Sequence, residues 1–189
     1  MINSSSEQER LCVNGMSFSA RGLPFSNAAL VVTVTPGDWG GAASGGISFQ
    51  RALEGSAYQA GGGGFIAPAQ RVTDFLKNSM GAGLPETSYR PGVRPAGLHH
   101  LLPEWIVHEL KHALRQFEKK MRGFITESAV LIGTETRTSS PVRIIRNEGF
   151  QSISHSGLYP VGEGAGYAGG IVSSAVDGIR CADIIASGG

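Results

Sequence analysis

Short apolar runs separated by glycine and proline dominate the chain, and only a few longer segments have helical periodicity. Residues 28–35 (AALVVTVT) form a β-branched apolar run that ends at Pro36, which predicts a buried strand. Residues 11–19 place Asn14-Gly15 between short apolar segments, which is typical of a β-hairpin. Three further short runs predict strands at 129–133, 141–146 and 157–161.

Three main helices are expected. The first covers residues 47–60 and stops at the glycines 61–64, the second follows Pro103 and runs to about Met121, and the third covers residues 170–186. Residues 70–77 suggest a short helix, and the glycine- and proline-rich stretches 36–46 and 79–97 predict loops. Together these elements predict an α+β fold with a mixed or mostly antiparallel sheet and about three main helices.

The composition excludes several classes of partner. The 189 residues carry a formal net charge of +1, so neither nucleic acid nor an anionic membrane surface is an expected partner. No apolar run approaches the roughly 18 residues of a membrane span, and the first residues lack the pattern of a secretion signal. We therefore expect a cytoplasmic protein. Glycine is unusual at 28 residues, about twice the average share of ~7%, which predicts tight turns or close backbone approach to a ligand.

The segment HELKH at 108–112 matches HExxH, the pattern of many zinc proteases. On a helical wheel, His108 and His112 lie nearly opposite the apolar stripe and share their face with three cations. The stripe consists of Ile106, Leu110, Ala113, Leu114, Phe117 and Met121, and the cations are Lys111, Arg115 and Lys119. Nearby cations disfavour a divalent metal, and Glu118 stands where the longer motif has its third histidine. We assign no metal ligand, and a zinc-dependent hydrolase remains an alternative.

A second motif, GxGxxG, occupies residues 164–169 and is followed by the last predicted helix. This order places backbone N–H groups and the positive helix end where they favour negative charge, and Glu163 can accept hydrogen bonds from a polyol. The second strand with an acidic residue about 20 positions on, which a nucleotide-binding unit requires, does not follow. Cofactor binding and a glycine-rich turn that packs the helix against a sheet both fit the motif.

Several longer segments resemble the C-terminal part of a family of FAD-dependent dehydrogenases in the glutathione-reductase-like class of flavoproteins: NGMSFSARG (14–22), AALVVTV (28–34), FQRALE (49–54), ETRTSSPVRI (135–144) and GLYPVGEGAGYAGGIVSSAVDGI (157–179). The resemblance implies a fragment of a two-domain FAD/NAD(P)-binding flavoprotein whose N-terminal FAD-binding domain is a missing partner. It also implies that residues 1–125 belong to a substrate or cap domain, and that residues 126–189 return to the FAD-binding domain.

The same resemblance implies site residues. Gly162 and Glu163 match the family's pair beside the ribityl chain of FAD, with Gly164 in the same turn. The helix start that faces the pyrimidine edge of the flavin matches Gly169, Gly170 and Ile171. Arg137 is a candidate clamp for a substrate carboxylate, and an arginine bound to backbone carbonyls before Pro141 is the alternative.

The expected activity is hydride transfer between a small-molecule organic substrate and flavin, carried out by the parent protein. The fragment alone is expected to have little activity and little affinity for FAD. A non-catalytic interaction module, including a homodimer that covers the surface left by the missing domain, is a further alternative.

Overall fold

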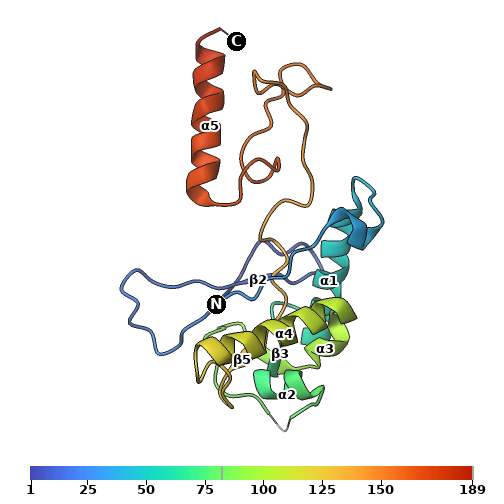
Figure 1. Ribbon diagram of the computed structural model, residues 1–189, viewed down its shortest axis with the longest axis vertical. Helices are drawn as coiled ribbons and strands as arrows, with labels where there is room; N and C mark the ends of the chain where they lie inside the picture. Colours follow the sequence, from blue (N-terminus) through green and yellow to red (C-terminus); the bar gives the residue numbers. More distant parts are fainter. Residues whose placement is uncertain (82, 189) are drawn as a thin grey trace. The chain divides into compact units, whose positions relative to one another are not determined.

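The computed structural model describes residues 1–81 and 83–188, so one position of the predicted loop 79–97 and the last position of the segment 126–189 lie outside the described residues. The chain divides into two compact units (Figure 1). Unit 1 comprises Met1–Val34 and Gln50–Thr136, and unit 2 comprises Thr35–Phe49 and Arg137–Gly189. The predicted domain boundary near residue 125 stays a prediction.

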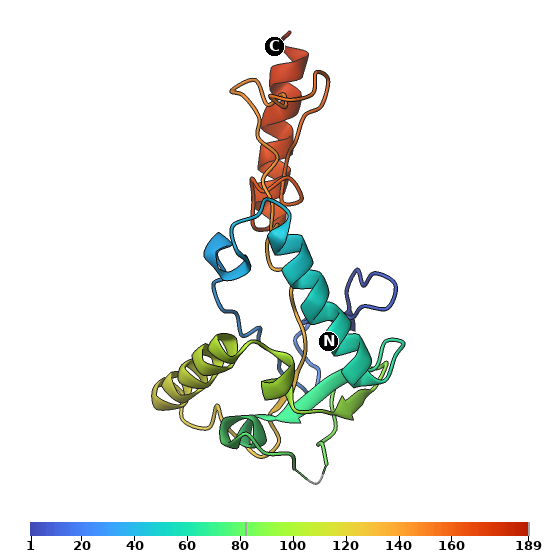
Figure 2. The ribbon, with the colours of Figure 1, turned by 90° about the vertical axis from the view of Figure 1, so that its right-hand side faces the viewer.

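Unit 1 is built around a mixed three-stranded sheet. The central strand β3 (Ala67–Arg71) pairs in parallel with β4 (Val93–Pro95) and antiparallel with β5 (Val130–Ile132). A separate antiparallel ribbon joins β1 (Ile2–Asn3) to β2 (Val13–Asn14). The helices of this unit are α2 (Val72–Lys77), α3 (Leu98–Leu101) and α4 (Glu104–Lys120), and α1 (Gly45–Gly61) leads into β3 (Figure 2). The predicted α+β class is confirmed.

Two apolar clusters hold unit 1 together. One contains Leu11, Val13, Ala57, Ala67 and Tyr89, and the other contains Val72, Phe75, Leu98, Val107 and Leu114. Helix α4 buries the second cluster through one apolar face, as its helical spacing predicts. The predicted burial of Met121 is wrong, because this residue follows the last turn of α4 and its side chain is 51% exposed.

The buried amide of Gln70 connects β3 to two neighbouring segments. Gln70 is 2% exposed, and its Nε2 donates a hydrogen bond to the carbonyl of Ser79 at 2.7 Å. Its Oε1 accepts a hydrogen bond from the N–H of Leu98 at 2.9 Å, which satisfies a free donor at the start of α3. This single side chain therefore fixes both the loop after α2 and the beginning of α3 against the sheet.

Four strand predictions are wrong. Residues 28–35 form no strand, and Val31 is 62% exposed, because no segment within residues 1–81 and 83–188 pairs with this run. Residues 11–19 do not fold back on themselves at Asn14-Gly15, since β2 pairs with β1 instead. Residues 141–146 contribute only an isolated bridge from Arg146 to Ser152, and residues 157–161 are irregular.

The helices were predicted with better success. Helix α1 and helix α5 (Ile171–Ala186) match the predicted ranges closely, and α4 begins directly after Pro103. Glycines 62–64, which follow α1, all have positive φ, which is the conformation that ends a helix. Unit 2 adds the short 3₁₀ helix η1 (Pro36–Trp39) and a long irregular segment before α5. None of the helices described for residues 1–81 and 83–188 is both long and apolar enough to cross a membrane.

Replacing Gln70 by leucine should destabilise unit 1 by about 2–4 kcal/mol, because the Leu98 N–H and the Ser79 carbonyl would lose their buried partner. Urea unfolding followed by the fluorescence of Trp105, in a Trp39→Phe background, measures this change. Gln59→Leu on the exposed side of α1 is the matched control and should change the free energy of unfolding by less than about 0.5 kcal/mol. Equal effects of the two substitutions would contradict the assigned role of Gln70.

Candidate functional site

An ion pair between Arg146 and Asp177 anchors α5 in unit 2. The Nη1 and Nη2 atoms of Arg146 donate hydrogen bonds to Oδ2 and Oδ1 of Asp177 at 2.9 and 2.7 Å. The two side chains are only 11% and 13% exposed. A two-pronged pair of this kind fixes orientation as well as distance, so it sets both the position and the rotation of α5 relative to the segment that carries Arg146.

Aromatic rings enclose the arginine. The guanidinium carbon of Arg146 lies 3.6 Å from the centre of the Tyr167 ring and 4.0 Å from the centre of the Phe150 ring. Nη1 also donates to the carbonyl of Pro160 at 2.7 Å. Stacking of this type stabilises a cation and excludes water from the ion pair. The planar guanidinium is therefore held from several directions at once.

The pair strongly favours the ionised carboxylate. The hydrogen bonds from Arg146 lower the pKa of Asp177 from 3.8 to about 2, and the N–H of Gly162 contributes in the same direction, whereas burial opposes both. The same contact raises the pKa of Arg146. A shift of this size corresponds to about 2 kcal/mol of stability at neutral pH.

The glycine-rich turn is attached to the same aspartate. The N–H of Gly162 donates to Oδ2 of Asp177 at 2.8 Å, so one carboxylate holds both Arg146 and the start of the turn. Two glycines are required by the backbone, because Gly162 and Gly166 have φ of +71° and +82°. A Cβ at Gly166 would also lie 2.5 Å from the carbonyl oxygen of Val142. The turn therefore packs tightly on the chain before Arg146.

Other glycines of the turn have no such structural reason. A Cβ at Gly164 or Gly169 would meet no atom within 4 Å, and at Gly170 it would meet only the Ser173 hydroxyl at an ordinary 3.7 Å. None of these three has a positive φ. The described residues of the chain thus leave open the side of the turn where these backbones lie, as a site for close approach of a ligand requires.

The start of α5 has neither a side-chain cap for its N–H groups nor an acidic residue to balance the helix dipole. Gly170 occupies the N-cap position without a side-chain cap, and the first turn contains no acidic residue. Ile171 is 91% exposed, and the hydroxyl oxygen of Ser174, next to Gly162, is buried without a hydrogen-bond partner among the described residues. Free N–H groups and the helix dipole make this end favourable for a negatively charged group.

The structure brings most of the predicted site residues together. Gly162, Glu163 and Gly164 form one turn, and Gly169, Gly170 and Ile171 form the uncapped helix start. The segment that follows Arg137 reaches the same turn, because the Ser140 hydroxyl donates to the carbonyl of Gly164 at 3.2 Å. Two further contacts run between these segments, from Arg143 Nε to the Gly166 carbonyl at 3.0 Å and from the Ile144 N–H to the Ala165 carbonyl at 3.1 Å.

Comparison with known proteins identifies the family. The family model described as "FAD-dependent protein, C-terminal domain-like" matches residues 1–138. The chain belongs to this family. It is also 47% identical over 188 residues to a protein of Clostridium beijerinckii (strain ATCC 51743 / NCIMB 8052) that is named only "Uncharacterized protein". That alignment covers 98% of this chain, including the turn and α5, and 35% of the relative, so the chain spans about a third of its length.

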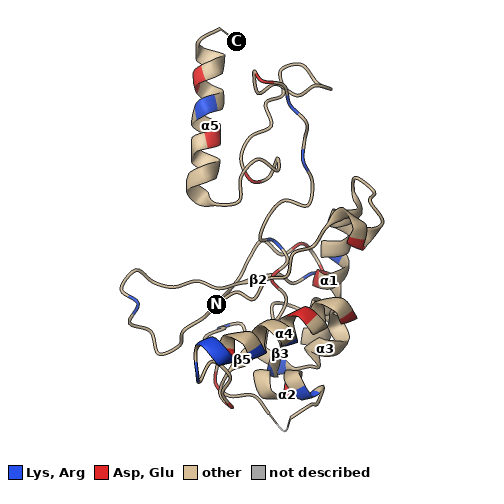
Figure 3. Ribbon diagram, in the orientation of Figure 1, with Lys and Arg blue, Asp and Glu red and all other residues tan. Residues whose placement is uncertain are grey.

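The HELKH segment lies outside this arrangement, on α4 of unit 1. His108 and His112 are exposed, and among residues 1–81 and 83–188 no three His, Cys, Asp or Glu residues are grouped as metal ligands. Lys and Arg gather toward the C-terminal half of α4 (Figure 3). Lys111 departs from the predicted exposed face, because its ammonium contacts Asn78 Oδ1 and lies 5.4 Å from the centre of the Phe75 ring.

Sequence reasoning missed the residues that hold the glycine-rich turn in place. Arg146 and Asp177 are 31 positions apart, and no local motif joins them. One signal was available: α5 carries only three charged residues, Asp177, Arg180 and Asp183 (Figure 3), in an otherwise apolar and small-residue helix. An aspartate that is buried in such a helix indicates a specific cationic partner.

Asp177→Asn should destabilise unit 2 by about 3–5 kcal/mol at pH 6, because it leaves the enclosed Arg146 without its counter-charge. Urea unfolding monitored by Trp39 fluorescence, in a Trp105→Phe background, reports on this unit. Asp183→Asn, on the exposed side of the same helix, is the matched control and should change little. Similar losses for both variants would contradict the role given to the ion pair.

The same pair predicts a pH dependence. Because the folded-state pKa of Asp177 lies below its unfolded value, its contribution is complete above about pH 5 and disappears as the pH falls through 3.8 toward 2. The difference in unfolding free energy between wild type and Asp177→Asn should therefore shrink by about 2 kcal/mol between pH 6 and pH 2. A difference that stays constant over this range would show that the Asp177 carboxylate is not stabilised by the fold.

Proposed function

We propose that this chain is the substrate-side and flavin-contacting part of an FAD-dependent dehydrogenase of the glutathione-reductase-like class, which transfers a hydride between a small organic substrate and flavin. Membership of an FAD-dependent family supports the cofactor. The observation that carries the proposal is the uncapped start of α5 beside glycines that the chain itself does not require. These features fit an anionic, planar group that approaches the backbone closely.

Within this proposal, each predicted residue has a specific task. Gly162, Glu163 and Gly164 lie along the ribityl chain, where the Glu163 carboxylate accepts hydrogen bonds from hydroxyl groups. The N–H groups that follow Gly169 and Gly170, beginning with that of Ile171, favour negative charge at the flavin edge that faces them. FAD, when bound, supplies the hydride chemistry, and these residues bind and orient it.

Arg137 is proposed to bind a carboxylate of the substrate. Its guanidinium remains charged at all physiological pH values and can contact both oxygens of a carboxylate. The residue directly follows Thr136 and precedes the Ser140 contact to the glycine-rich turn. A substrate held by Arg137 would therefore be bound by the same segment that supports the flavin-binding turn.

The remaining partner is proposed to be an FAD-binding domain, with residues 1–125 as the substrate or cap domain and residues 126–189 as the return to that domain. Helix α5 supports this arrangement, because it exposes a set of apolar side chains: Ile171, Val172, Val176, Ile179 and Ile185 are 40–91% exposed. Apolar surface of this extent on one helix is typical of a contact with another part of a protein. The two thirds of the relative that lie outside the alignment supply a candidate for that part.

The cofactor proposal is tested in a chimera in which this chain replaces the matching third of the Clostridium beijerinckii relative. The purified chimera should carry flavin, measured as absorbance near 450 nm per polypeptide. Gly164→Val and Gly169→Val should each lower flavin content at least tenfold, because a side chain would occupy the open side of the turn. Gly178→Ala, in the middle of α5 where a Cβ meets nothing, is the control and should retain flavin.

Flavin content that is unchanged by both valine substitutions would contradict the assignment of the turn. The chain by itself should bind FAD weakly, because its sequence contributes contacts to the flavin end and no complete dinucleotide-binding unit. Tight flavin binding by the 189-residue chain would show that this division of the site is wrong.

The contact proposed for α5 makes a separate prediction. Val172→Glu should change the unfolding free energy of the chain alone by less than about 0.5 kcal/mol, because Val172 is 76% exposed. In the chimera the same substitution should lower the melting temperature by several degrees, because a charge would be buried at the interface. Arg180→Glu, which lies away from the helix start, is the control and should leave the melting temperature of the chimera nearly unchanged. A chimera insensitive to Val172→Glu would contradict the interface.

A further inference from the structure

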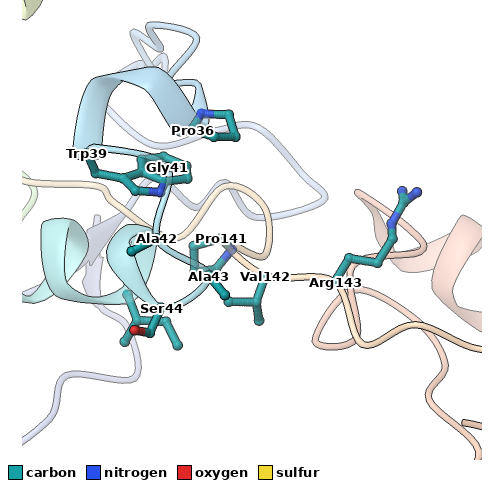
Figure 4. Close-up of a pocket in the computed structure, with 10 residues that line it drawn as sticks. Pro36, Trp39, Gly41, Ala42, Ala43, Ser44, Pro141, Val142 and Arg143 are labelled. Carbon is teal, nitrogen blue, oxygen red and sulfur yellow. The ribbon is translucent and has the colours of Figure 1, made fainter. Parts of the chain in front are cut away.

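A cavity of about 430 Å³ lies within unit 2, between the 36–46 loop, the first turn of α1 and residues 141–143 (Figure 4). Its lining is mostly apolar and includes Pro36, Trp39, Ile47, Pro141 and Val142. The volume falls within the range of roughly 300–1,000 Å³ that small-molecule sites occupy. None of the residues proposed to bind flavin lines it.

The fold fixes the indole of Trp39 at this cavity. The start of helix η1 is fixed by Asp38, whose Oδ2 accepts hydrogen bonds from the Thr35 N–H and hydroxyl at 2.6 and 2.8 Å. The ring then lies against the start of α1, where a Cβ at Gly45 would be 2.2 Å from Trp39 Cδ1. A Cβ at Gly46 would be 2.8 Å from Pro141 Cβ. Two consecutive glycines therefore allow the indole and the 141–143 wall to approach the helix.

Polar groups at the cavity are available to a ligand. The Trp39 indole N–H and the Ser44 hydroxyl have no hydrogen-bond partner among the described side chains and backbone. Helix α1, 17 residues long, begins here without an acidic residue in its first turn, so its positive end is not neutralised. The two donors lie at opposite ends of the cavity (Figure 4). An apolar wall with an aromatic ring beside a positive helix end suits a flat apolar group that carries an anionic oxygen.

The cavity is connected to the flavin-binding turn through one residue. Arg143 lines the cavity with part of its length, and its side chain extends away from Trp39 (Figure 4). At the other end, Arg143 Nε donates to the Gly166 carbonyl at 3.0 Å, and its guanidinium lies 5.0 Å from the centre of the Tyr167 ring. The cavity wall and the turn are therefore held by the same short segment.

We propose that this cavity binds the substrate of the flavin reaction and that the substrate is a small aromatic carboxylate, whose ring packs on Trp39 and whose carboxylate lies at the positive end of α1. The substrate role rests on the proposed function, whereas aromatic carboxylate binding by the cavity does not require flavin. Arg137 does not line the cavity, so a carboxylate bound by Arg137 would be a second one on the same substrate.

The test uses the 189-residue chain without flavin and benzoate as the probe. The indole N–H signals of the two tryptophans are followed by ¹⁵N-edited NMR during titration. The Trp39 signal should shift with a Kd of about 1 mM, the value expected for a ligand of nine heavy atoms. Benzyl alcohol, which lacks the charge, should bind about tenfold more weakly, and acetate, which lacks the ring, should cause no shift.

Two variants check the location of binding. Trp39→Leu should weaken benzoate binding at least tenfold, measured by ¹⁹F line broadening of 4-fluorobenzoate. Ala43→Leu keeps the tryptophan and its packing but fills exposed space at the cavity, so it should also weaken binding about tenfold. Trp105→Phe, on α4 of unit 1, is the control and should bind as wild type. Unchanged spectra outside the site confirm that each variant is folded.

Benzoate that binds equally well to the wild type, Trp39→Leu and Ala43→Leu would overturn the proposal, and so would benzyl alcohol binding as tightly as benzoate. Failure of the flavin assignment is recognised separately in the chimera, because that measurement follows absorbance near 450 nm and involves no benzoate. If the chimera binds no flavin but the 189-residue chain still binds benzoate, the aromatic carboxylate site is supported and its link to flavin chemistry is not.

Discussion

The enclosed ion pair between Arg146 and Asp177 determines the geometry of unit 2. Much of this unit is irregular backbone, and its long helix contacts the rest through a narrow face around Ser174, Asp177 and Cys181. Removing two charges from water is costly, so such a pair persists only where hydrogen bonds and packing satisfy both partners. Here the carboxylate is bound by Arg146 and the Gly162 N–H, and the guanidinium is bound by Asp177, the Pro160 carbonyl and two aromatic rings.

This constraint separates two kinds of glycine in one short motif. Gly162 and Gly166 are required by the turn itself, through positive φ and close backbone contact. Gly164, Gly169 and Gly170 satisfy no comparable need within the described chain, although a side chain at these positions would reduce backbone freedom and favour folding. Their retention at an uncapped helix start is explained if a ligand lies against them, which is the physical basis of the flavin proposal.

Elements with strong local signals were predictable from the sequence. Helix α4 has a clear apolar face and a proline before its first turn, and α1 ends where consecutive glycines begin. Strands β3 and β4 were missed, since APAQR contains proline and small residues and owes its strand conformation to pairing on both sides. The strand prediction for 28–35 failed for the opposite reason: its composition favours a strand, but none of the described segments pairs with it.

The candidate site also has parts that the sequence predicts and parts that it does not. The glycine-rich turn and the start of α5 were predicted because their signals lie within one segment of sequence. The Arg146–Asp177 pair and the Trp39 cavity depend on residues brought together from distant segments, which periodicity and motif spacing do not reveal. Long-range pairing of polar side chains is specified by the whole fold, so only the structure shows which arginine reaches which aspartate.

The most direct test of the central claim is the flavin content of the chimera when Arg146 is replaced by methionine, a side chain of similar length without charge. If the ion pair places the α5 start beside the turn, Arg146→Met should lower the absorbance near 450 nm per polypeptide at least tenfold. Arg180→Met, on the exposed side of α5, should leave it unchanged. Full flavin content in the Arg146→Met chimera would contradict the account.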